Sequence, residues 1–204
     1  MDQEALWRGE FGDAYIARNT PSDDKLASLT RHWAAVLRGT TGAPPADILE
    51  VGANIGLNLM ALRRLTTARL IAVEPNATAR ARLADSGVAD QALDGIAARI
   101  PLPDAGVDLA FTSGVLIHIH PDQLEASCRE ILRVSRRYVV CIEYFSDKPE
   151  EVLYRGHAQA LFKRDFGGFW MDLAPELRLL DYGFAWKRAT GLDNLTWQLF
   201  EKPQ

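Results

Sequence analysis

The turn at residues 50–56 constrains the fold of this chain more than any other feature of its sequence. It follows a buried strand pattern, Asp-Ile-Leu-Glu-Val at 47–51, and precedes apolar residues spaced for a helix between 57 and 65. Glu50, Gly52 and Gly56 form the spacing E-x-G-x-x-x-G. A strand, a glycine turn and a helix in this order predict the first unit of a parallel α/β sheet.

The same alternation continues along the chain. Strand patterns occupy 70–73, 107–111 and 138–142, and the segments between them have helical patterns, one expected to begin at a cap on Asn76 and one at a capping box of Asp122 and Glu125. Residues 177–182 and 195–200 are strand patterns with too little sequence between them for a long helix. The sequence therefore predicts an α/β fold, a Rossmann-like doubly wound sheet that is mostly parallel, with an antiparallel C-terminal strand pair.

Composition excludes several classes of protein. The formal net charge of −4 argues against a nucleic-acid partner, which would favour a basic face. Cys128 and Cys141 lack the spacing of metal ligands or of a redox pair, so we expect no metal and no disulfide framework. The first residues contain no apolar run of the length that a signal peptide or membrane span needs, and we expect a cytoplasmic protein without membrane contact.

The glycine turn also indicates which cofactor the chain binds. Gly52 allows a sharp turn against a ligand and Gly56 allows close helix packing, but Asn54 occupies the position where a dinucleotide site has its middle glycine. Glu74 ends the second strand, where a carboxylate can accept from both ribose hydroxyls. A nucleoside cofactor without phosphates, S-adenosylmethionine, fits this pattern best. The alternative is that Glu50 and Glu74 only terminate strands.

Further cofactor contacts are predicted around this turn. Asp94 can accept from the adenine amino group with Ile96 packed on the ring, although Asp94-Gly95 is equally typical of a plain turn. Arg18 can pair with the methionine carboxylate, with Tyr15 closing the same side, although a surface arginine is an almost equal alternative. The predicted cofactor site is Glu50, Gly52, Asn54, Gly56, Glu74, Asp94, Ile96, Tyr15 and Arg18.

With these motifs the sequence resembles a known family, the class I S-adenosylmethionine-dependent methyltransferases, and within it the pseudaminic acid biosynthesis-associated methylases. The closer resemblance rests on F-G-D-A-Y-I-A-R-N at 11–19, L-E-V-G-A-N-I-G-L-N-L at 49–59, G-V-L-I-H-I at 114–119, E-Y-F-S at 143–146, Y-R-G-H at 154–157, K-R-D-F at 163–166 and L-T-W-Q-L-F-E-K at 195–202. It spans nearly the whole chain. The resemblance implies the fold, the cofactor and a role near acidic-sugar metabolism.

Methyl transfer needs alignment of donor and acceptor and, for a hydroxyl acceptor, a group that takes a proton. His118 follows the strand at 107–111 at the ligand-binding edge of the sheet and is the preferred proton acceptor, with His157 and Glu143 as the other candidates. A histidine that only packs at the strand end is an equal alternative. Neither cysteine is placed as a nucleophile, and residues 112–115 lack the Asn-Pro-Pro-aromatic turn of adenine amino-methylating enzymes.

A cluster of basic and aromatic residues follows the strand at 138–142 and predicts an anionic, partly apolar acceptor. The predicted substrate contacts are Tyr144, Tyr154, Arg155, Lys163 and Arg164. A solvated helix face over packed aromatic residues is the alternative for any one of them.

These observations predict a single domain over 1–204. It comprises an N-terminal helical lid at 1–45, a cofactor-binding core at 46–145, a substrate insert at 146–175 and a C-terminal strand pair at 176–204. The predicted reaction is methyl transfer to a hydroxyl or amine of a small acidic molecule, such as a nonulosonic acid sugar or its precursor. The alternatives are a nicotinamide-dependent oxidoreductase and a non-catalytic scaffold that binds S-adenosylmethionine.

Overall fold

The computed structural model describes residues 3–203. Helices and strands alternate over most of this range. In chain order the elements are α1 (Gln3–Arg8), α2 (Glu10–Ile16), α3 (Asp23–Leu37), η1 (Arg38–Thr40), β1 (Asp47–Val51), α4 (Leu57–Leu62), β2 (Arg69–Val73), α5 (Ala77–Ser86), β3 (Gln91–Leu93), β4 (Val107–Ser113), η2 (Leu116–His118), α6 (Pro121–Val134), β5 (Ser135–Glu143), β6 (Glu150–Glu151), β7 (Phe162–Lys163), α7 (Phe166–Leu173), β8 (Arg178–Ala185), α8 (Lys187–Thr190) and β9 (Leu195–Glu201).

Seven strands form one sheet in the order β3-β2-β1-β4-β5-β9-β8. The first five strands pair in parallel, and β9 joins β5 and β8 in antiparallel register. The predicted fold class, including the antiparallel C-terminal pair, is confirmed. The sequence analysis missed β3, whose three residues are too few to produce a periodic pattern.

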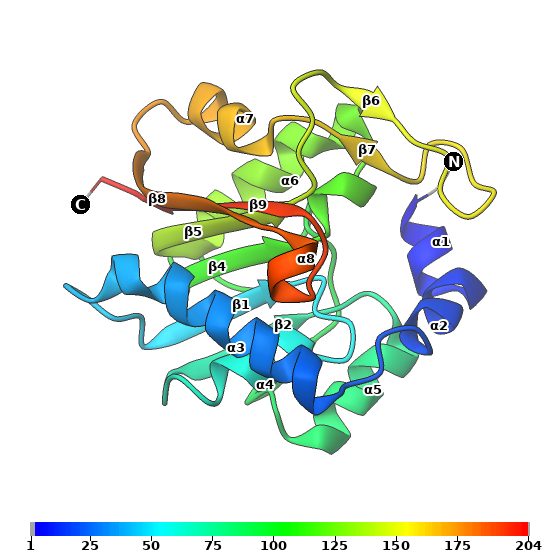
Figure 1. The fold of residues 1–204 in the computed structure, drawn as a ribbon, viewed down its shortest axis with the longest axis horizontal. Coiled ribbons are helices and arrows are strands. Elements are labelled where there is room, and N and C mark those ends of the chain that lie inside the picture. The colour runs from blue at the N-terminus through cyan, green and yellow to red at the C-terminus, as the bar shows by residue number, and fades with distance from the viewer. Residues whose placement is uncertain (1–2, 204) are drawn as a thin grey trace.

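Helices cover both faces of this sheet (Figure 1). On one face, α3, α4 and α5 bury Trp33, Leu59 and Leu83 against the strands. On the other face, α6 and α7 bury Ile131 and Trp170. Because the interior strands are covered on both sides, they consist of nearly continuous apolar runs rather than alternating ones.

Two segments gather beyond the carboxyl ends of the parallel strands (Figure 1). One is the helix pair α1 and α2, and the other is the connection that contains the small antiparallel pair of β6 and β7. In open α/β sheets ligands bind at this edge. Over residues 3–203 the helices are too short or too polar to cross a bilayer.

Local structure differs from the expected pattern at two places. Trp7, Phe11 and Tyr15 are four residues apart, the spacing of one helix face, but they lie on two short helices, because Gly9 interrupts the segment between them. Helix α6 begins one residue before the expected capping box, since His120 is its N-cap, with Nδ1 accepting from the Asp122 amide, and Pro121 occupies the first helical position. Asn76 caps α5 as expected.

Gly56 offers a test of how tightly the glycine turn is built. It has φ of +80°, and a Cβ added there would lie 2.6 Å from Leu83 Cδ2. Gly87 has φ of +64° with nothing near an added Cβ. We therefore expect Gly87→Ala to lower the free energy of unfolding by about 1 kcal/mol and Gly56→Ala by about 2 kcal/mol or more, in urea denaturation. An equal decrease in the free energy of unfolding of the two variants would show that the Leu83 side chain can move to accommodate the added methyl group without destabilising the fold.

Candidate active site

The loop between β1 and α4 turns back on itself through three left-handed residues. Gly52, Asn54 and Gly56 have φ of 73°, 49° and 80°. The backbone amides of Gly52 and Ala53 both donate to the carbonyl of Val73 on the neighbouring strand β2. A Cβ at Gly52 would lie 2.7 Å from Val115 Cγ2, so only glycine fits here. The loop is thus fixed between β2 and the turn after β4.

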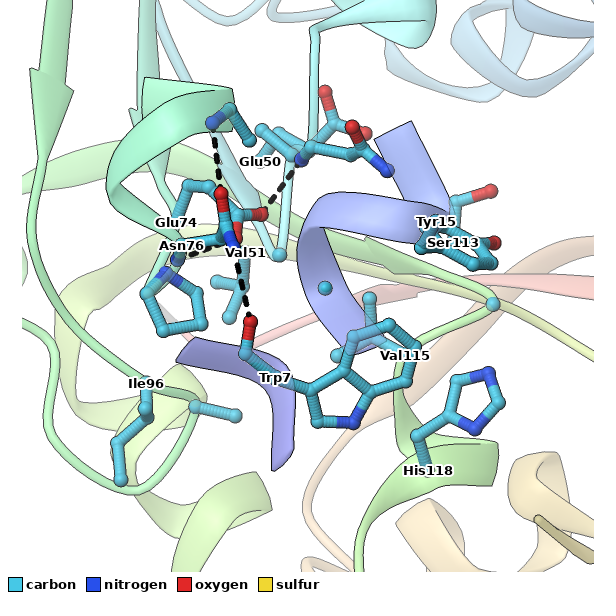
Figure 2. Close-up of a pocket in the computed structure, with 18 of the residues that line it drawn as sticks. Trp7, Tyr15, Glu50, Val51, Glu74, Asn76, Ile96, Ser113, Val115 and His118 are labelled. Carbon is cyan, nitrogen blue, oxygen red and sulfur yellow. Dashed lines mark hydrogen bonds between the residues drawn. The ribbon is translucent and has the colours of Figure 1, made fainter. Parts of the chain in front are cut away.

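Glu74 fixes the other side of this loop. Its carboxylate accepts from the Asn54 amide at 2.7 Å and from the Asn76 amide at 2.8 Å, as Figure 2 shows. Burial raises the pKa of Glu74, while these two bonds oppose the shift. Each carboxylate oxygen can accept more than one hydrogen bond, so the predicted ribose contact is compatible with this position.

Glu50 is connected to the neighbouring helices by a chain of side chains. The Trp33 Nε1 donates to Asn58 Oδ1 at 3.1 Å, and Asn58 Nδ2 donates to Glu50 Oε1 at 2.7 Å. The second oxygen, Oε2, is buried without a hydrogen-bond partner. Burial raises the pKa of Glu50 to about 8. A positively charged ligand group beside this unpaired oxygen would favour the ionised form of Glu50, which would then accept a hydrogen bond from it.

These groups line one cavity, referred to below as the cofactor cavity. Its lining includes three acidic residues, Glu4, Glu50 and Glu74, and no lysine or arginine from residues 3–203. Of the predicted cofactor residues, the ones that line it are Tyr15, Glu50, Gly52, Asn54, Glu74 and Ile96. The cavity therefore suits a ligand with net positive charge.

The helix pair α1 and α2 lines one side of the cofactor cavity, with Trp7 and Tyr15 among its contributions. Arg8 bonds to Asp94 Oδ1 and to the carbonyl of Pro75, both at the far side of the cavity. This places Asp94 differently from its predicted adenine contact, because its half-exposed carboxylate is paired with Arg8 and Arg80 and does not line the cavity. Arg18 also lies outside, with its guanidinium 5.0 Å from the centre of the Tyr15 ring.

A second cavity, referred to below as the acceptor cavity, adjoins the first. The residues that line both cavities are Tyr15, Asn19, Leu57, Asn58, Ser113, Gly114 and His118. A Cβ added at Gly114 would meet no atom within 4 Å, so the space beside it is open. A group that leaves the cofactor cavity towards the acceptor cavity must pass between these shared residues.

His118 lies at this junction in a defined protonation state. Its side chain is buried, and burial lowers its pKa to about 4. Its Nδ1 lies 2.6 Å from the carbonyl of Ala160, which can only accept, so Nδ1 carries the proton. The imidazole is therefore neutral, and Nε2 is the nitrogen left to accept a proton.

Glu143 has a different place from the catalytic one predicted for it. Its carboxylate is fully buried, lines neither cavity, and accepts from the backbone amides of Val115, Leu116 and Ile117 at 3.1, 3.0 and 3.4 Å. Burial raises its pKa to about 7. With three backbone donors on it, Glu143 positions the turn that carries His118 rather than contacting a substrate.

The predicted substrate residues divide into two groups. Tyr144, Tyr154 and Lys163 line the acceptor cavity. Arg155 and Arg164 line neither cavity, and neither does His157, which was predicted as a catalytic candidate. Arg155 is exposed at a tight turn with φ of 52°, since Tyr154 and His157 pair directly across it. Arg164 lies over the Phe169 ring, 4.5 Å from its centre.

The structure adds lining residues that the sequence analysis did not select. Trp7 and Asn58 belong to the cofactor cavity, and Lys25 and His32, from α3, belong to the acceptor cavity. The helical spacing of Trp7 with Phe11 and Tyr15 is a signal in the sequence that could have identified Trp7. No local pattern distinguishes Lys25 from an ordinary surface lysine. Residues 3–203 contain no group of three or more His, Cys, Asp or Glu placed to hold a metal.

Comparisons with known proteins agree with this geometry. Residues 49–142 match a family model described as a methyltransferase domain. No curated protein matches.

Solved structures share the fold over almost the whole chain. The 1,6-didemethyltoxoflavin-N1-methyltransferase of Burkholderia thailandensis, solved with S-adenosylhomocysteine, is 22% identical with a TM-score of 0.73, over 98% of this chain and 88% of that one. The magnesium protoporphyrin IX methyltransferase of Synechocystis PCC 6803, solved with bound S-adenosylmethionine, is 9% identical with a TM-score of 0.70, over 100% and 98%. The [4+2]-cyclase SpnF is 15% identical with a TM-score of 0.65, over 85% and 80%.

The cofactor contacts predicted for Glu74 and Asp94 can be tested separately by mutation. Loss of a charged acceptor for hydroxyl hydrogen bonds costs about 1.5 to 3 kcal/mol, so Glu74→Ala should weaken S-adenosylmethionine binding about tenfold or more in calorimetry. Asp94→Ala, which removes a carboxylate outside the cavity, is the matched control and should change affinity less. Unchanged affinity in folded Glu74→Ala would refute the ribose contact, and an equal loss in Asp94→Ala would support the adenine contact.

Burial of neutral His118 makes stability depend on pH. Its folded pKa of about 4 lies below the usual 6.5, so the unfolded chain binds the proton more readily. The stabilisation of the folded state by neutral His118 is complete above pH 6.5. It is lost as the pH falls towards 4, which lowers the free energy of unfolding by up to about 3 kcal/mol. In urea unfolding at pH 7 and pH 4.5, His118→Asn should therefore lose less free energy of unfolding than the wild type. If the free energy of unfolding falls equally in the wild type and in His118→Asn between the two pH values, the imidazole is not held in its neutral form.

Proposed function

We propose that this protein is an S-adenosylmethionine-dependent methyltransferase that acts on a hydroxyl or amine of a small acidic molecule. The observation that carries the proposal is the pair of joined cavities at the sheet edge. One is lined by three acidic residues and by no lysine or arginine from residues 3–203, and the other contains two lysines. The match of residues 49–142 to a methyltransferase domain supports the same reaction.

Charge favours S-adenosylmethionine over a dinucleotide. At neutral pH its sulfonium and amino groups outweigh its carboxylate, whereas a pyrophosphate would bring negative charge beside Glu50 and Glu74. The left-handed Asn54 also replaces the glycine that clears space for a pyrophosphate. Glu74 would hold the ribose, and the unpaired Oε2 of Glu50 would accept from the amino group.

The acceptor cavity suits a small anion with an apolar body. Lys25 and Lys163 line it, and among residues 3–203 neither has an acidic partner within ion-pair distance. Asp193, the acid in the same lining, is already bonded to the Tyr144 hydroxyl at 2.8 Å and to Lys187 at 3.1 Å. The apolar lining residues are Leu29, Leu57, Ile117, Ile142, Val152, Leu161, Leu192 and Leu195. A carboxylate would therefore find two lysines free to bind it.

The chain's own residues would carry out the remaining steps. When bound, the cofactor supplies an electrophilic methyl group. The α1–α2 lid excludes water from the donor, and Glu143 holds the turn that directs His118 to the junction. Nε2 of His118 would accept the proton of an acceptor hydroxyl or amine. The acidic-sugar resemblance makes a nonulosonic acid or its precursor the first candidate for the acceptor.

Titration and turnover measurements test this proposal. Calorimetry should show binding of S-adenosylmethionine and none of nicotinamide dinucleotides. Release of S-adenosylhomocysteine should then be measured with nonulosonic acids, their nucleotide-linked forms and small amino acids. Dinucleotide binding would favour an oxidoreductase. Binding of S-adenosylmethionine with no release, including with a cell extract, would favour a non-catalytic scaffold.

Replacement of Lys163 tests the acidic acceptor. Lys163→Ala should raise the Michaelis constant of the acidic acceptor about tenfold, because a charge-assisted hydrogen bond contributes about 1.5 to 3 kcal/mol. The dissociation constant of S-adenosylmethionine should stay unchanged. Arg155→Ala removes a cation outside both cavities and is the matched control. A larger effect in Arg155→Ala, or equal turnover of a neutral acceptor, would contradict the assignment.

A further inference from the structure

An aromatic cluster, defined here as Trp7, Phe11, Tyr15, His118 and Tyr154, lies under the N-terminal lid. Trp7 is at its centre, with ring centroids 5.2 Å from Phe11, 5.3 Å from Tyr15 and 4.8 Å from His118. Tyr154 adds a ring 5.1 Å from His118. In Figure 2 the Trp7 indole lies between the Glu74 side of the cavity and His118.

The cluster coincides with the place where the two cavities meet. Trp7, Tyr15 and His118 line the cofactor cavity, and Tyr15 and His118 also line the acceptor cavity. Phe11 contacts Trp7 and Tyr154 but lines neither cavity. Because a transferred methyl must lie between donor and acceptor, we expect the sulfonium that carries it beside Tyr15 and His118, with the Trp7 ring next to both.

The electrostatics of this place suit a cation. Ring faces of tryptophan and tyrosine attract positive charge, most strongly where water is excluded. The guanidinium of Arg18, 5.0 Å from the Tyr15 ring centre, is another cation near this ring, but it is exposed to solvent, which screens it, and it lines neither cavity. His118 adds no repulsion, because burial lowers its pKa to about 4 and leaves the imidazole neutral. No described lysine or arginine lines the cofactor cavity.

We propose that Trp7 and Tyr15 are specificity-determining residues that bind the positively charged sulfonium through their rings, so that the site holds S-adenosylmethionine more tightly than neutral S-adenosylhomocysteine. This inference rests on the proposed function. Once the methyl group has left, the sulfur is uncharged and the attraction to the rings disappears. The rings that strengthen binding of the donor therefore give no such added affinity to the product.

Calorimetric titration of three ligands tests the proposal without turnover. S-adenosylmethionine carries the sulfonium, S-adenosylhomocysteine has a neutral sulfur, and sinefungin has a protonated amine near the same position. Trp7→Leu should weaken the two cationic ligands about three- to thirtyfold more than S-adenosylhomocysteine, the range expected for a cation beside an aromatic ring. Phe11→Leu removes a ring from the same cluster but from outside the cavities, and should leave the affinity ratio unchanged.

Tyr15 gives a second comparison that does not depend on Trp7. Tyr15→Phe keeps the ring and should keep the ratio of affinities, whereas Tyr15→Leu should lower it. Equal weakening of all three ligands in Trp7→Leu and Tyr15→Leu would refute charge selection and leave the rings as lid packing. If the wild type binds neither S-adenosylmethionine nor S-adenosylhomocysteine, the proposed function itself is wrong.

Discussion

Three hydrogen bonds, from successive backbone amides to the Glu143 side chain, fix the turn on which the two cavities meet. This turn, at Val115 to Ile117, carries Val115 against Gly52 on one side and leads to His118 on the other. The turn therefore defines a wall of the cofactor cavity and the junction with the acceptor cavity together. A carboxylate buried without solvent can stay in place only because backbone donors surround it.

The two cavities have opposite electrostatic character, and this follows from which elements build them. The cofactor cavity takes its acids from strand ends, with Glu50 on β1 and Glu74 after β2. The acceptor cavity takes its lysines from α3, which packs on a face of the seven-stranded sheet, and from β7, which belongs to the separate two-stranded sheet. A cationic donor and an anionic acceptor would each be drawn to its own side and meet at the neutral His118.

Sequence analysis predicted the central part of the fold because strands buried on both faces leave clear apolar runs. It also selected Gly52 and Glu74, which line the cofactor cavity, since backbone turns and strand ends depend on local spacing, whereas Gly56 lies against Leu83 and does not line that cavity. It failed where placement depends on distant contacts. Gly156 is a local turn signal beside Arg155, but no local pattern shows that this turn leaves the Arg155 side chain exposed and outside both cavities. The role of Glu143 likewise depends on amides 26 to 28 residues away in the sequence.

The strand pair β6 and β7 belongs to no other sheet, and this separation has a consequence for how such an enzyme can diversify. Residues between 152 and 163 provide part of the acceptor cavity but no strand of the seven-stranded sheet that supports the cofactor. Exchange or lengthening of this segment can change the accepted molecule while the donor machinery stays intact. One scaffold can in this way serve many different chemistries, with substrate choice inherited separately from the cofactor.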